Sequence, residues 1–466
     1  MNEKVKHSRW GEGIVIAERY NGLELLVRFD KGFRLWMKQN ELKFLTRPPQ
    51  KVMAVPISVP PKPPEEEQIA RIMIESLRLG VVPTKYIHRF TFGREREVKQ
   101  LQEWLKTEGG VLHIIGQYGS GKTHLLKILY SMCLELGYAV AFVGLDPTET
   151  PFHRPKKVYS KIIETFRFRD GDNLKGFREF LKSLGQNETL SRSLDDHIYL
   201  GQVIRRVSRY SSSFDGDPEI VELYFNWLEG KTYSCFFSPG LYDDGKAANI
   251  YCNILSGIST AAKRCGLKGL TVIFDETENV QAPWLYTYQK DRAANFLKGM
   301  TLLAKNDQRL VKEPVERARD HYPANQFSTL WLRLSPLHYS SSYHYSLVGT
   351  QTGLTYHSWA SHVRYAYCQP SHMKIVFAFT PTPHSMGEKE ETAIYLSPLT
   401  EESKLKITEE LARLYSKAYS FSIKRELVTE IFEKAKSVSL LRLFIKGVIE
   451  ILDFVRYYPH KSMDDL

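Results

Sequence analysis

Residues 111–130 read VLHIIGQYGSGKTHLLKILY, and this stretch decides the fold. The run VLHII predicts a buried strand, and the leucine-rich run after Lys122 predicts a helix. Between them, Gly116-x-x-x-x-Gly121-Lys122-Thr123 has the spacing of a phosphate-binding loop. Glycines let backbone N–H groups turn toward phosphate oxygens, and the positive end of the helix dipole attracts the same anion. We therefore predict an α/β fold in which a parallel sheet carries a P loop.

The residue types of this loop have separate expected tasks. We expect the amine of Lys122 to reach the β- and γ-phosphates of a nucleotide, and the hydroxyl of Thr123 to bind Mg²⁺. The predicted nucleotide-binding residues are Gly116, Gln117, Tyr118, Gly119, Ser120, Gly121, Lys122, Thr123 and His124.

A second motif, KGLTVIFDETENV at residues 268–280, supplies acidic groups. Residues 270–274 form an unbroken apolar run, which is typical of a central parallel strand. The run ends in Asp275 and Glu276. Asp275 can hold Mg²⁺ through water, and Glu276 can orient and deprotonate an attacking water. An acidic helix start is the alternative, but beside a P loop the motif favours hydrolysis, with Lys122 and Glu276 as catalytic residues.

The composition favours a globular protein with a polyanionic partner. The chain has 466 residues, enough for two or three domains, and a net charge of +11. This charge favours nucleic acid over a membrane as the partner. The five cysteines include no C-x-x-C pair, which argues against disulfides and structural zinc. Because no apolar run is long enough to span a bilayer and the first residues lack the apolar core of a secretion signal, we expect a cytoplasmic protein without membrane contact.

A proline-rich segment divides the chain. Residues 46–66 hold seven of the 22 prolines, and such a segment forms a stiff, extended spacer. We predict a folded part at 1–46, a linker at 47–66, a P-loop core at 67–398 and a helical C-terminal lid at 399–466. Within the core, 150–255 has the pattern of a helical insertion. A second insertion, 321–371, is rich in Ser, Tyr and His; the alternatives are a flexible segment, a base-stacking surface, or a metal site that its spacings do not favour.

Residues 1–46 have the pattern of short strands. Asn21-Gly22 between alternating runs is a strong hairpin signal, and we predict a small SH3-like β-barrel. The stretch VKHSRWGEGIVIA…LLVRFDKGFRLW…ELKFL resembles the Tudor-like modules at the C-termini of UvrD/PcrA-type helicases and the CarD-type modules. That resemblance implies contact with nucleic acid or RNA polymerase; a structural appendage is the alternative. Trp10 is expected to stack or pack, and Trp36, in an alternating strand, to pack in the core. The predicted phosphate contacts are Lys4, Lys6, Arg9, Arg28, Arg34 and Lys38.

The segment from about residue 67 to about residue 455 resembles the ATP-binding proteins of BREX-type phage-defence islands, the BrxD-type branch of the AAA+/STAND ATPases. The motifs that carry this resemblance are IMIESLRLGVVP, FGREREV, GQYGSGKTHLLK, HRPKKVYSKII, GLTVIFDETENV, VFAFTPTP and SLLRLFIKGVIEILD. A P loop and an acidic box fit any AAA+ protein, whereas the combination is more specific. The N-terminal module and residues 321–371 depart from the pattern, so the biological system is BREX or a relative.

The resemblance implies three further site residues. Arg94 belongs to a GRE element, which lines the base pocket in AAA+ and STAND ATPases. Thr380 ends a predicted buried strand where AAA+ proteins place a polar residue that touches the γ-phosphate or the attacking water. Arg442 matches the nucleotide-sensing arginine of the lid, and a solvent-facing helix arginine is the alternative.

The resemblance also implies cofactors and partners. ATP and Mg²⁺ are the expected cofactors, and Mg²⁺-dependent ATP hydrolysis is the expected activity. DNA, bound without sequence preference, and other defence-system proteins are the expected partners. AAA+ ATPases complete their site with an arginine from a neighbouring subunit, so a homo-oligomer is expected, with Arg292 and Arg309 as candidates by position. Two alternatives stay open: a STAND-like ATP-dependent switch that recruits an effector protein, and a DNA translocase subunit.

Overall fold

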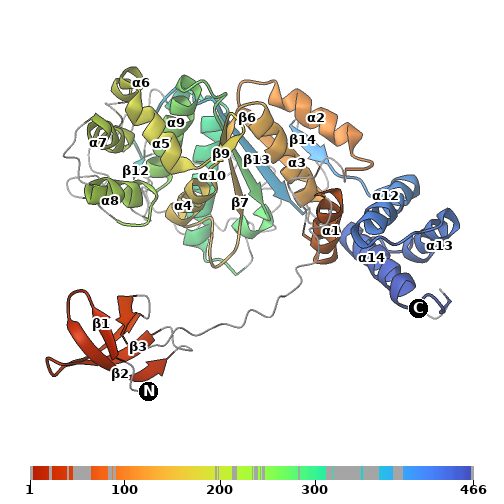
Figure 1. Ribbon diagram of the computed structural model, residues 1–466. Coiled ribbons are helices and arrows are strands. Elements are labelled where there is room, and N and C mark those ends of the chain that lie inside the picture. Colours follow the sequence, from red (N-terminus) through yellow and green to blue (C-terminus); the bar gives the residue numbers. More distant parts are fainter. Residues whose placement is uncertain are drawn as a thin grey trace. The chain divides into compact units, whose positions relative to one another are not determined.

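The computed structural model describes residues 4–19, 24–38, 41–45, 65–81, 87, 91–194, 197, 199–212, 218–233, 235, 240–241, 243, 247–281, 284–310, 318–319, 348–349, 367–380 and 392–462. The chain forms two compact units, Met1–Pro63 and Pro64–Leu466, whose elements are drawn in Figure 1. The Asn21-Gly22 turn lies outside the described residues, as does the predicted linker apart from its last two residues. The insertion predicted at 321–371 also lies outside them, apart from Val348–Gly349 and residues 367–371.

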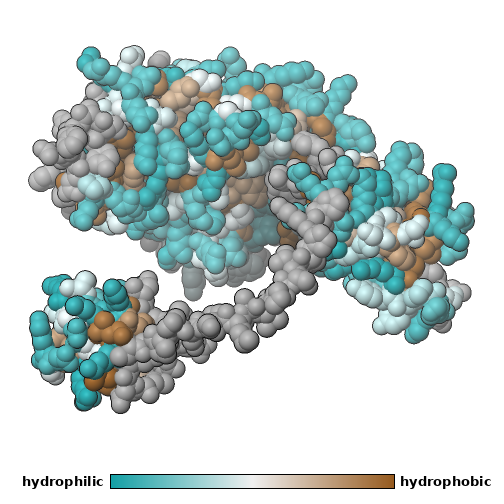
Figure 2. Space-filling model, viewed as in Figure 1, coloured by the Kyte–Doolittle hydropathy of each residue, from teal (hydrophilic) through white to brown (hydrophobic). Residues whose placement is uncertain are grey.

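The first unit is an antiparallel sheet of five strands in the order β4-β3-β2-β1-β5. The strands are β1 (Lys4–His7), β2 (Gly11–Arg19), β3 (Glu24–Phe29), β4 (Arg34–Lys38) and β5 (Leu42–Phe44). Val5, Val27 and Phe29 lie at the centre of its small hydrophobic core. Figure 2 shows both hydrophobic and hydrophilic areas on the surface of this unit. The structure is a small β module, while its likeness to an SH3-like or Tudor-like fold stays a prediction.

The prediction that Trp36 packs in this core is wrong. Trp36 is 40% exposed, whereas Trp10 packs against the core cluster. In the register of β3 and β4, Trp36 lies opposite Leu26. Because side chains alternate along a strand, this position faces away from the side on which Leu25 and Val27 are buried. The alternating pattern was correct, but Trp36 belongs to the outer face.

The second unit is built on a parallel sheet in the order β14-β6-β13-β10-β7. These strands are β6 (Gly110–Ile115), β7 (Ala139–Gly144), β10 (Leu270–Asp275), β13 (Met373–Phe379) and β14 (Ala393–Tyr395). Every residue of β10 and β13 is buried, as expected for parallel strands that are covered on both faces. The predicted α/β fold with a parallel P-loop sheet is confirmed.

Helices cover both faces of this sheet (Figure 1). On one face, α2 (Glu95–Leu105) and α3 (Lys122–Glu135) share a hydrophobic cluster with Leu112, Ile273 and Val376. On the other face, α4 (Pro155–Thr165), α9 (Ala247–Arg264) and α10 (Thr287–Ala304) share a larger cluster with Val272 and Phe377. Adjacent residues of one strand thus join different clusters, which makes three layers with the sheet in the middle.

Residues 150–255 are mainly helical, as their pattern predicted. They contain α4, α5 (Phe177–Gln186), α6 (Glu188–Arg192), α7 (Leu200–Ser212), α8 (Pro218–Leu228) and the first half of α9. A short hairpin of β8 (Phe168–Asp170) and β9 (Asn173–Lys175) was not predicted. The buried side chains of these helices extend the cluster on the α9 and α10 face, and α6, α7 and α8 lie at the end of the core opposite the C-terminal helices (Figure 1).

Four helices form a separate body at the C-terminal end, which we call the lid. They are α1 (Glu65–Arg78), α12 (Glu401–Tyr419), α13 (Arg425–Ala435) and α14 (Leu441–Tyr457), and they share one hydrophobic cluster. A helix was predicted at this place, but its packing with the C-terminal helices was not, because α1 precedes the core in sequence. It is fixed by Arg71, which donates two hydrogen bonds to the carbonyl of Ala418, and by an ion pair of Arg78 with Asp453 at 2.9 Å. Among the described residues, no helix is long and apolar enough to cross a membrane.

Candidate active site

Three adjacent strands bring the predicted site residues together. The P loop follows β6, Thr380 follows β13, and Glu276 follows Asp275 at the end of β10. Because β13 lies between β6 and β10 in a parallel sheet, these three segments meet at one edge. The carboxyl edge of an open parallel sheet is the usual place for ligands.

Glycines shape the loop for geometric reasons. Gly119 and Gly121 have φ angles of +73° and +97°, a conformation that glycine adopts without steric cost. At Gly116 a Cβ atom would lie 2.5 Å from the Ser120 hydroxyl oxygen. Gly121 caps the start of α3, so the backbone N–H groups of the first turn are directed toward the loop.

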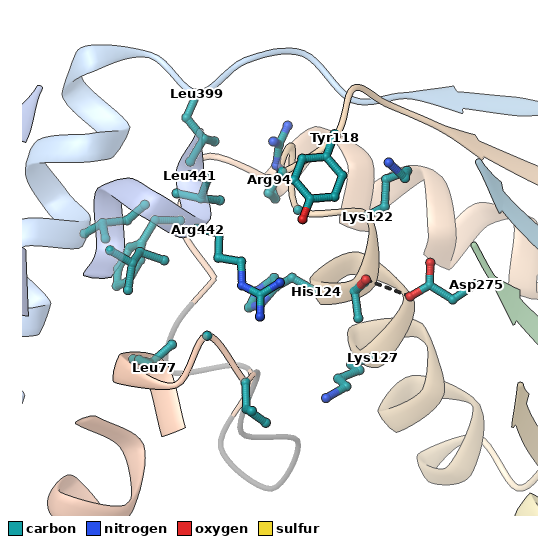
Figure 3. Close-up of a pocket in the computed structure, with 18 of the residues that line it drawn as sticks. Leu77, Arg94, Tyr118, Lys122, His124, Lys127, Asp275, Leu399, Leu441 and Arg442 are labelled. Atoms are coloured by element: carbon teal, nitrogen blue, oxygen red, sulfur yellow. Dashed lines mark hydrogen bonds between the residues drawn. The ribbon is translucent and has the colours of Figure 1, made fainter. Parts of the chain in front are cut away.

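The side chains of Lys122 and Thr123 both form hydrogen bonds within the site. Lys122 Nζ donates hydrogen bonds to the carbonyl oxygens of Gly116 (2.9 Å) and Gln117 (3.2 Å) and to Thr380 Oγ1 (2.9 Å). Thr123 Oγ1 donates to Asp275 Oδ2 at 2.7 Å, the bond drawn in Figure 3. Burial lowers the pKa of Lys122, although nearby carboxylates oppose this shift.

Glu276 is held in an unusual backbone conformation. Its φ angle is +55°, and its N–H donates to Asp275 Oδ1 at 2.9 Å. A left-handed conformation is rare for a residue with a side chain and is often found at functional positions. Burial raises the pKa of Glu276, and the carboxylates of Asp275, Glu278 and Asp146 raise it further. Such a shift moves a carboxylate toward the basicity that suits a general base.

Two residues at this edge were not predicted. Glu278, in the short helix η3 (Thr277–Gln281), accepts a hydrogen bond from Thr380 Oγ1 at 3.0 Å. The tight turn of η3 directs Glu278 toward the P loop. The sequence DETE, in which the two glutamates are two residues apart, was the only sequence signal for the presence of Glu278 at the site. Lys127 lies one helical turn after Thr123 on α3 and lines the same pocket; its four-residue spacing from Thr123 could have indicated this.

These residues form one side of a pocket of about 470 Å³ between the P loop and the lid. The P-loop side is polar and holds Lys122, Asp275 and Glu276. The opposite side is mainly apolar and consists of side chains from α1, α12 and α14 and from the chain segments after α1, before α2 and before α12. Its apolar members are Leu77, Val81, Phe92, Leu399, Ile407, Leu441 and Ile445. A polar end for phosphates and an apolar end for a base is the arrangement that a nucleotide requires.

Arg442 and Arg94 contribute to this pocket in different ways. Arg442 extends from the start of α14 into the pocket (Figure 3), as the predicted nucleotide-sensing role requires. Arg94 lines the pocket but is buried, and its guanidinium donates to the carbonyls of Ser120 (2.7 Å) and Ser397 (2.9 Å) and pairs with Glu97. It therefore ties the P loop to the segment that leads into the lid.

The remaining predicted residues lie around the pocket or away from it. His124 Nε2 is 3.1 Å from Thr91 Oγ1, and Tyr118 is an exposed side chain at the pocket rim. Arg309 forms an ion pair with Asp307 at 2.7 Å, and Arg292 lies over the ring of Tyr288. Neither Arg292 nor Arg309 is among the described residues that line the pocket.

The donor atoms at this edge fit Mg²⁺. A threonine hydroxyl and an aspartate carboxylate are hard oxygen ligands, and Mg²⁺ is usually bound by one or two protein groups while it keeps several waters. Thr123 and Asp275 provide such a pair, 2.7 Å apart. Among the described residues there is no group of three or more His, Cys, Asp or Glu arranged to hold a metal.

The sequence of the P-loop region identifies its relatives. Residues 66–187 match the family of BREX system ATP-binding proteins BrxC/D. The predicted resemblance is thereby confirmed for this segment. The BrxC/D-like segment contains α1, the P loop and Arg94, while Asp275, Thr380 and Arg442 come from later parts of the chain.

Other comparisons add little to this match. Among solved structures, the Walker-type ATPase PABY2304 of Pyrococcus abyssi is similar, with a TM-score of 0.34 and 9% sequence identity over 78% of this chain and 68% of that chain. No curated protein matches the chain in sequence.

Proposed function

We propose that this protein binds ATP with Mg²⁺ and hydrolyses it. The observation that carries the proposal is the hydrogen bond of Thr123 to Asp275 beside Lys122, at the edge where three parallel strands end. The BrxC/D match over residues 66–187 supports ATP as the nucleotide.

Each group has a role that its position supports. Lys122 exchanges its bonds to loop carbonyls and Thr380 for bonds to the β- and γ-phosphates. Glu276 accepts the proton of the attacking water, and Thr380, which also contacts Lys122 and Glu278, orients that water or the γ-phosphate. Thr123 and Asp275 would hold Mg²⁺, which would supply positive charge to the phosphates. Arg442 contacts the nucleotide from the lid.

We further propose that the protein acts on DNA within a multi-component anti-phage system. The BrxC/D match and the net charge of +11 support this. The outer face of the N-terminal sheet gives a further reason to propose a contact with DNA. Arg28 lies directly opposite Arg34 across β3 and β4, both are exposed, and Trp36 lies two residues further on. Like charges opposite each other destabilise a sheet, and a bound phosphate removes that repulsion.

A homo-oligomer belongs to the same proposal. An arginine that acts on a neighbour's nucleotide does not line the pocket of its own chain. Arg292 and Arg309 are both absent from the described residues that line the pocket. In the proposed oligomer, the site of each subunit is completed by the neighbouring subunit.

Steady-state ATP hydrolysis, measured with and without DNA, tests the chemistry. We expect Lys122→Ala to lose ATP binding. Glu276→Gln should bind ATP and hydrolyse it at least about 10²-fold more slowly, the scale of a lost general base. Glu278→Gln, a matched change two residues away, should have a smaller effect because Glu278 contacts Thr380 instead of the water.

Three results would contradict the proposal. Equal rates for Glu276→Gln and the wild type remove Glu276 from its role, and a larger loss in Glu278→Gln transfers that role to Glu278. ATP binding without steady-state turnover in the wild type, with DNA present, identifies an ATP-dependent switch instead of an ATPase.

A further inference from the structure

Three exposed aromatic side chains gather where α10 begins. Trp284, Tyr286 and Tyr288 are 66%, 70% and 55% exposed. The rings of Tyr286 and Tyr288 are stacked, with centroids 6.0 Å apart and planes at 8°. Large aromatic rings are usually at least partly buried, and a local group of exposed ones indicates a binding surface. We call Tyr286 and Tyr288, with Trp284 beside them in sequence, the tyrosine platform.

The backbone beneath the platform is fixed. Tyr286 is the N-cap of α10, and its N–H donates to the side chain of Gln289 at 2.9 Å. The other end of the Gln289 amide lies 3.3 Å from His153 Nε2, in the loop after β7. A surface that is rigid before binding loses less entropy when a ligand arrives. The platform is therefore already organised for stacking.

Positive side chains from α10 and α4 lie on or near the platform. The guanidinium of Arg292 lies 5.6 Å from the ring centre of Tyr288. Arg154 and Lys157, at the start of α4, are exposed. Burial lowers the pKa of His153, and the charges of Arg154, Arg292 and Lys157 lower it further, which indicates that all three cations lie near His153. Asp243 is a carboxylate near these cations; burial raises its pKa, although Arg154, Arg292 and Lys156 oppose that shift.

The platform is connected to the catalytic edge of the sheet. The amide of Asn279 in η3 donates to the carbonyl of Leu145 at 2.7 Å, and the N–H of Leu145 donates to the carbonyl of Asp275 at 3.1 Å. Asn279, which lies between Asp275 and the platform in the sequence, is thus bonded to the loop after β7. The loop after β7, which contacts Gln289 beneath the platform through His153, is thus also bonded to Asn279 and Asp275.

We propose that the tyrosine platform binds single-stranded nucleic acid. Unpaired bases stack on Tyr286 and Tyr288, and the phosphates contact Arg154, Lys157 and Arg292. Stacking needs a free base face, which a duplex does not offer within its length, and alternation of aromatic and basic groups is the general means of holding single strands. The proposal deepens the DNA-related part of the proposed function and does not depend on ATP hydrolysis.

Fluorescence anisotropy with the full-length protein tests the platform. The probes are labelled oligothymidine and oligouridine strands of about 20 nucleotides, longer than common single-strand site sizes, an abasic strand with the same phosphates, and a duplex. The test variant is Tyr286→Ala with Tyr288→Ala. The control variant is Tyr457→Ala with Tyr458→Ala, which removes another exposed tyrosine pair, 64% and 54% exposed and likewise next to an arginine, at the end of α14.

We expect the platform variant to bind the thymidine strand at least about fivefold more weakly, since loss of base–aromatic stacking has this effect or a larger one. Its affinity for the abasic strand and the duplex should not change, and the control variant should bind every probe as the wild type does. Weaker binding of oligothymidine alone, with oligouridine unaffected, restricts the surface to DNA and still supports it.

Unchanged affinity for both base-containing strands in the platform variant would overturn the proposal, and so would an equal loss for the abasic strand. Retained strand binding together with loss of a partner protein would make the surface a protein-docking site and also overturn it. ATP hydrolysis of the same samples is measured in parallel. If the wild type does not hydrolyse ATP but its strand binding depends on the platform, only the proposed ATPase activity is contradicted.

Discussion

His197 is enclosed between α7 and α9, and its surroundings favour the neutral imidazole. Nδ1 accepts the N–H groups of Tyr199 and Leu200 at 3.3 Å each, and Nε2 lies 3.2 Å from the carbonyl of Asn253. Burial lowers the pKa of His197 to about 4 from 6.5, although the bond to Asn253 opposes the shift. The folded state therefore resists protonation that the unfolded chain accepts.

This makes the second unit sensitive to acid. As the pH falls from about 6.5 to about 4, the unfolded chain binds a proton at His197 before the folded state does, so stability decreases over this window. From about pH 7 to about pH 5, the wild type should lose ~2 kcal/mol more unfolding free energy than His197→Gln. Urea unfolding followed by the fluorescence of Trp227, which stacks on Tyr199, measures this difference. An identical pH dependence of the two proteins would show that His197 is protonated equally in both states.

At the level of single residues, the sequence predicted those roles that a local spacing encodes. Lys122, Thr123 and Asp275 were found because the P loop and the acidic strand end are local patterns. Thr380 came only through the resemblance. The bonds of Arg94 to Ser120 and Ser397, and the contact of Glu278 with Thr380, join residues far apart in the chain, so no spacing could reveal them.

At the level of elements, the end of α1 controls the position of Arg442. Gly80 has a φ angle of +73°, and a Cβ there would lie 2.4 Å from Arg442 Nε. Gly80→Ala should therefore displace Arg442 from the pocket as well as strain the backbone. Gly137, just after α3, has a φ of +83° with no atom within 4 Å of such a Cβ, which makes Gly137→Ala the matched control for strain alone.

Both alanine variants should lose about 1–2 kcal/mol of stability from the left-handed backbone. Only Gly80→Ala should also bind ATP more weakly, as measured by titration with a fluorescent ATP analogue. Equal ATP affinity in the two variants would assign Arg442 to the solvent-facing alternative.

Strand β6, helix α3 and strand β10 could be predicted because each has a continuous apolar run beside a motif. The strand order could not, since it depends on pairing between strands that are widely separated in sequence. The hairpin β8–β9 was also missed, because its strands are three residues long and too short to show a period. The membership of α1 in the lid follows from packing with residues more than 300 positions later.

At the level of the whole molecule, the two units allow the DNA contact to be separated from the chemistry. Deletion of residues 1–46 should weaken DNA binding and DNA-stimulated hydrolysis but leave basal hydrolysis intact, because the P-loop core and lid form their own compact unit. If phosphate contacts dominate, affinity should fall steeply with salt, and the deletion should reduce that slope. Binding measured at two salt concentrations checks both statements.

A double substitution serves as a control for any general effect of the deletion on the protein. Arg28→Gln with Arg34→Gln removes the exposed pair of opposed arginines and leaves the strands in place. It should reproduce part of the loss of DNA affinity and of the salt slope. If both the deletion and this variant bind DNA as the wild type does, the N-terminal unit is not the DNA contact.

The place of α1 has a mechanical consequence. The segment predicted as a proline-rich linker leads into α1, which begins at Glu65, and α1 is packed with α12 and α14 in the lid cluster. The N-terminal unit is therefore connected to the rest of the chain at a helix of the lid. Any rotation of the lid against the sheet moves this point of connection. Conversely, tension on this connection pulls on α1, which ends at Arg78, two residues before Gly80, where the chain lies beside Arg442. A force on the N-terminal unit and a ligand in the pocket would therefore both act on α1.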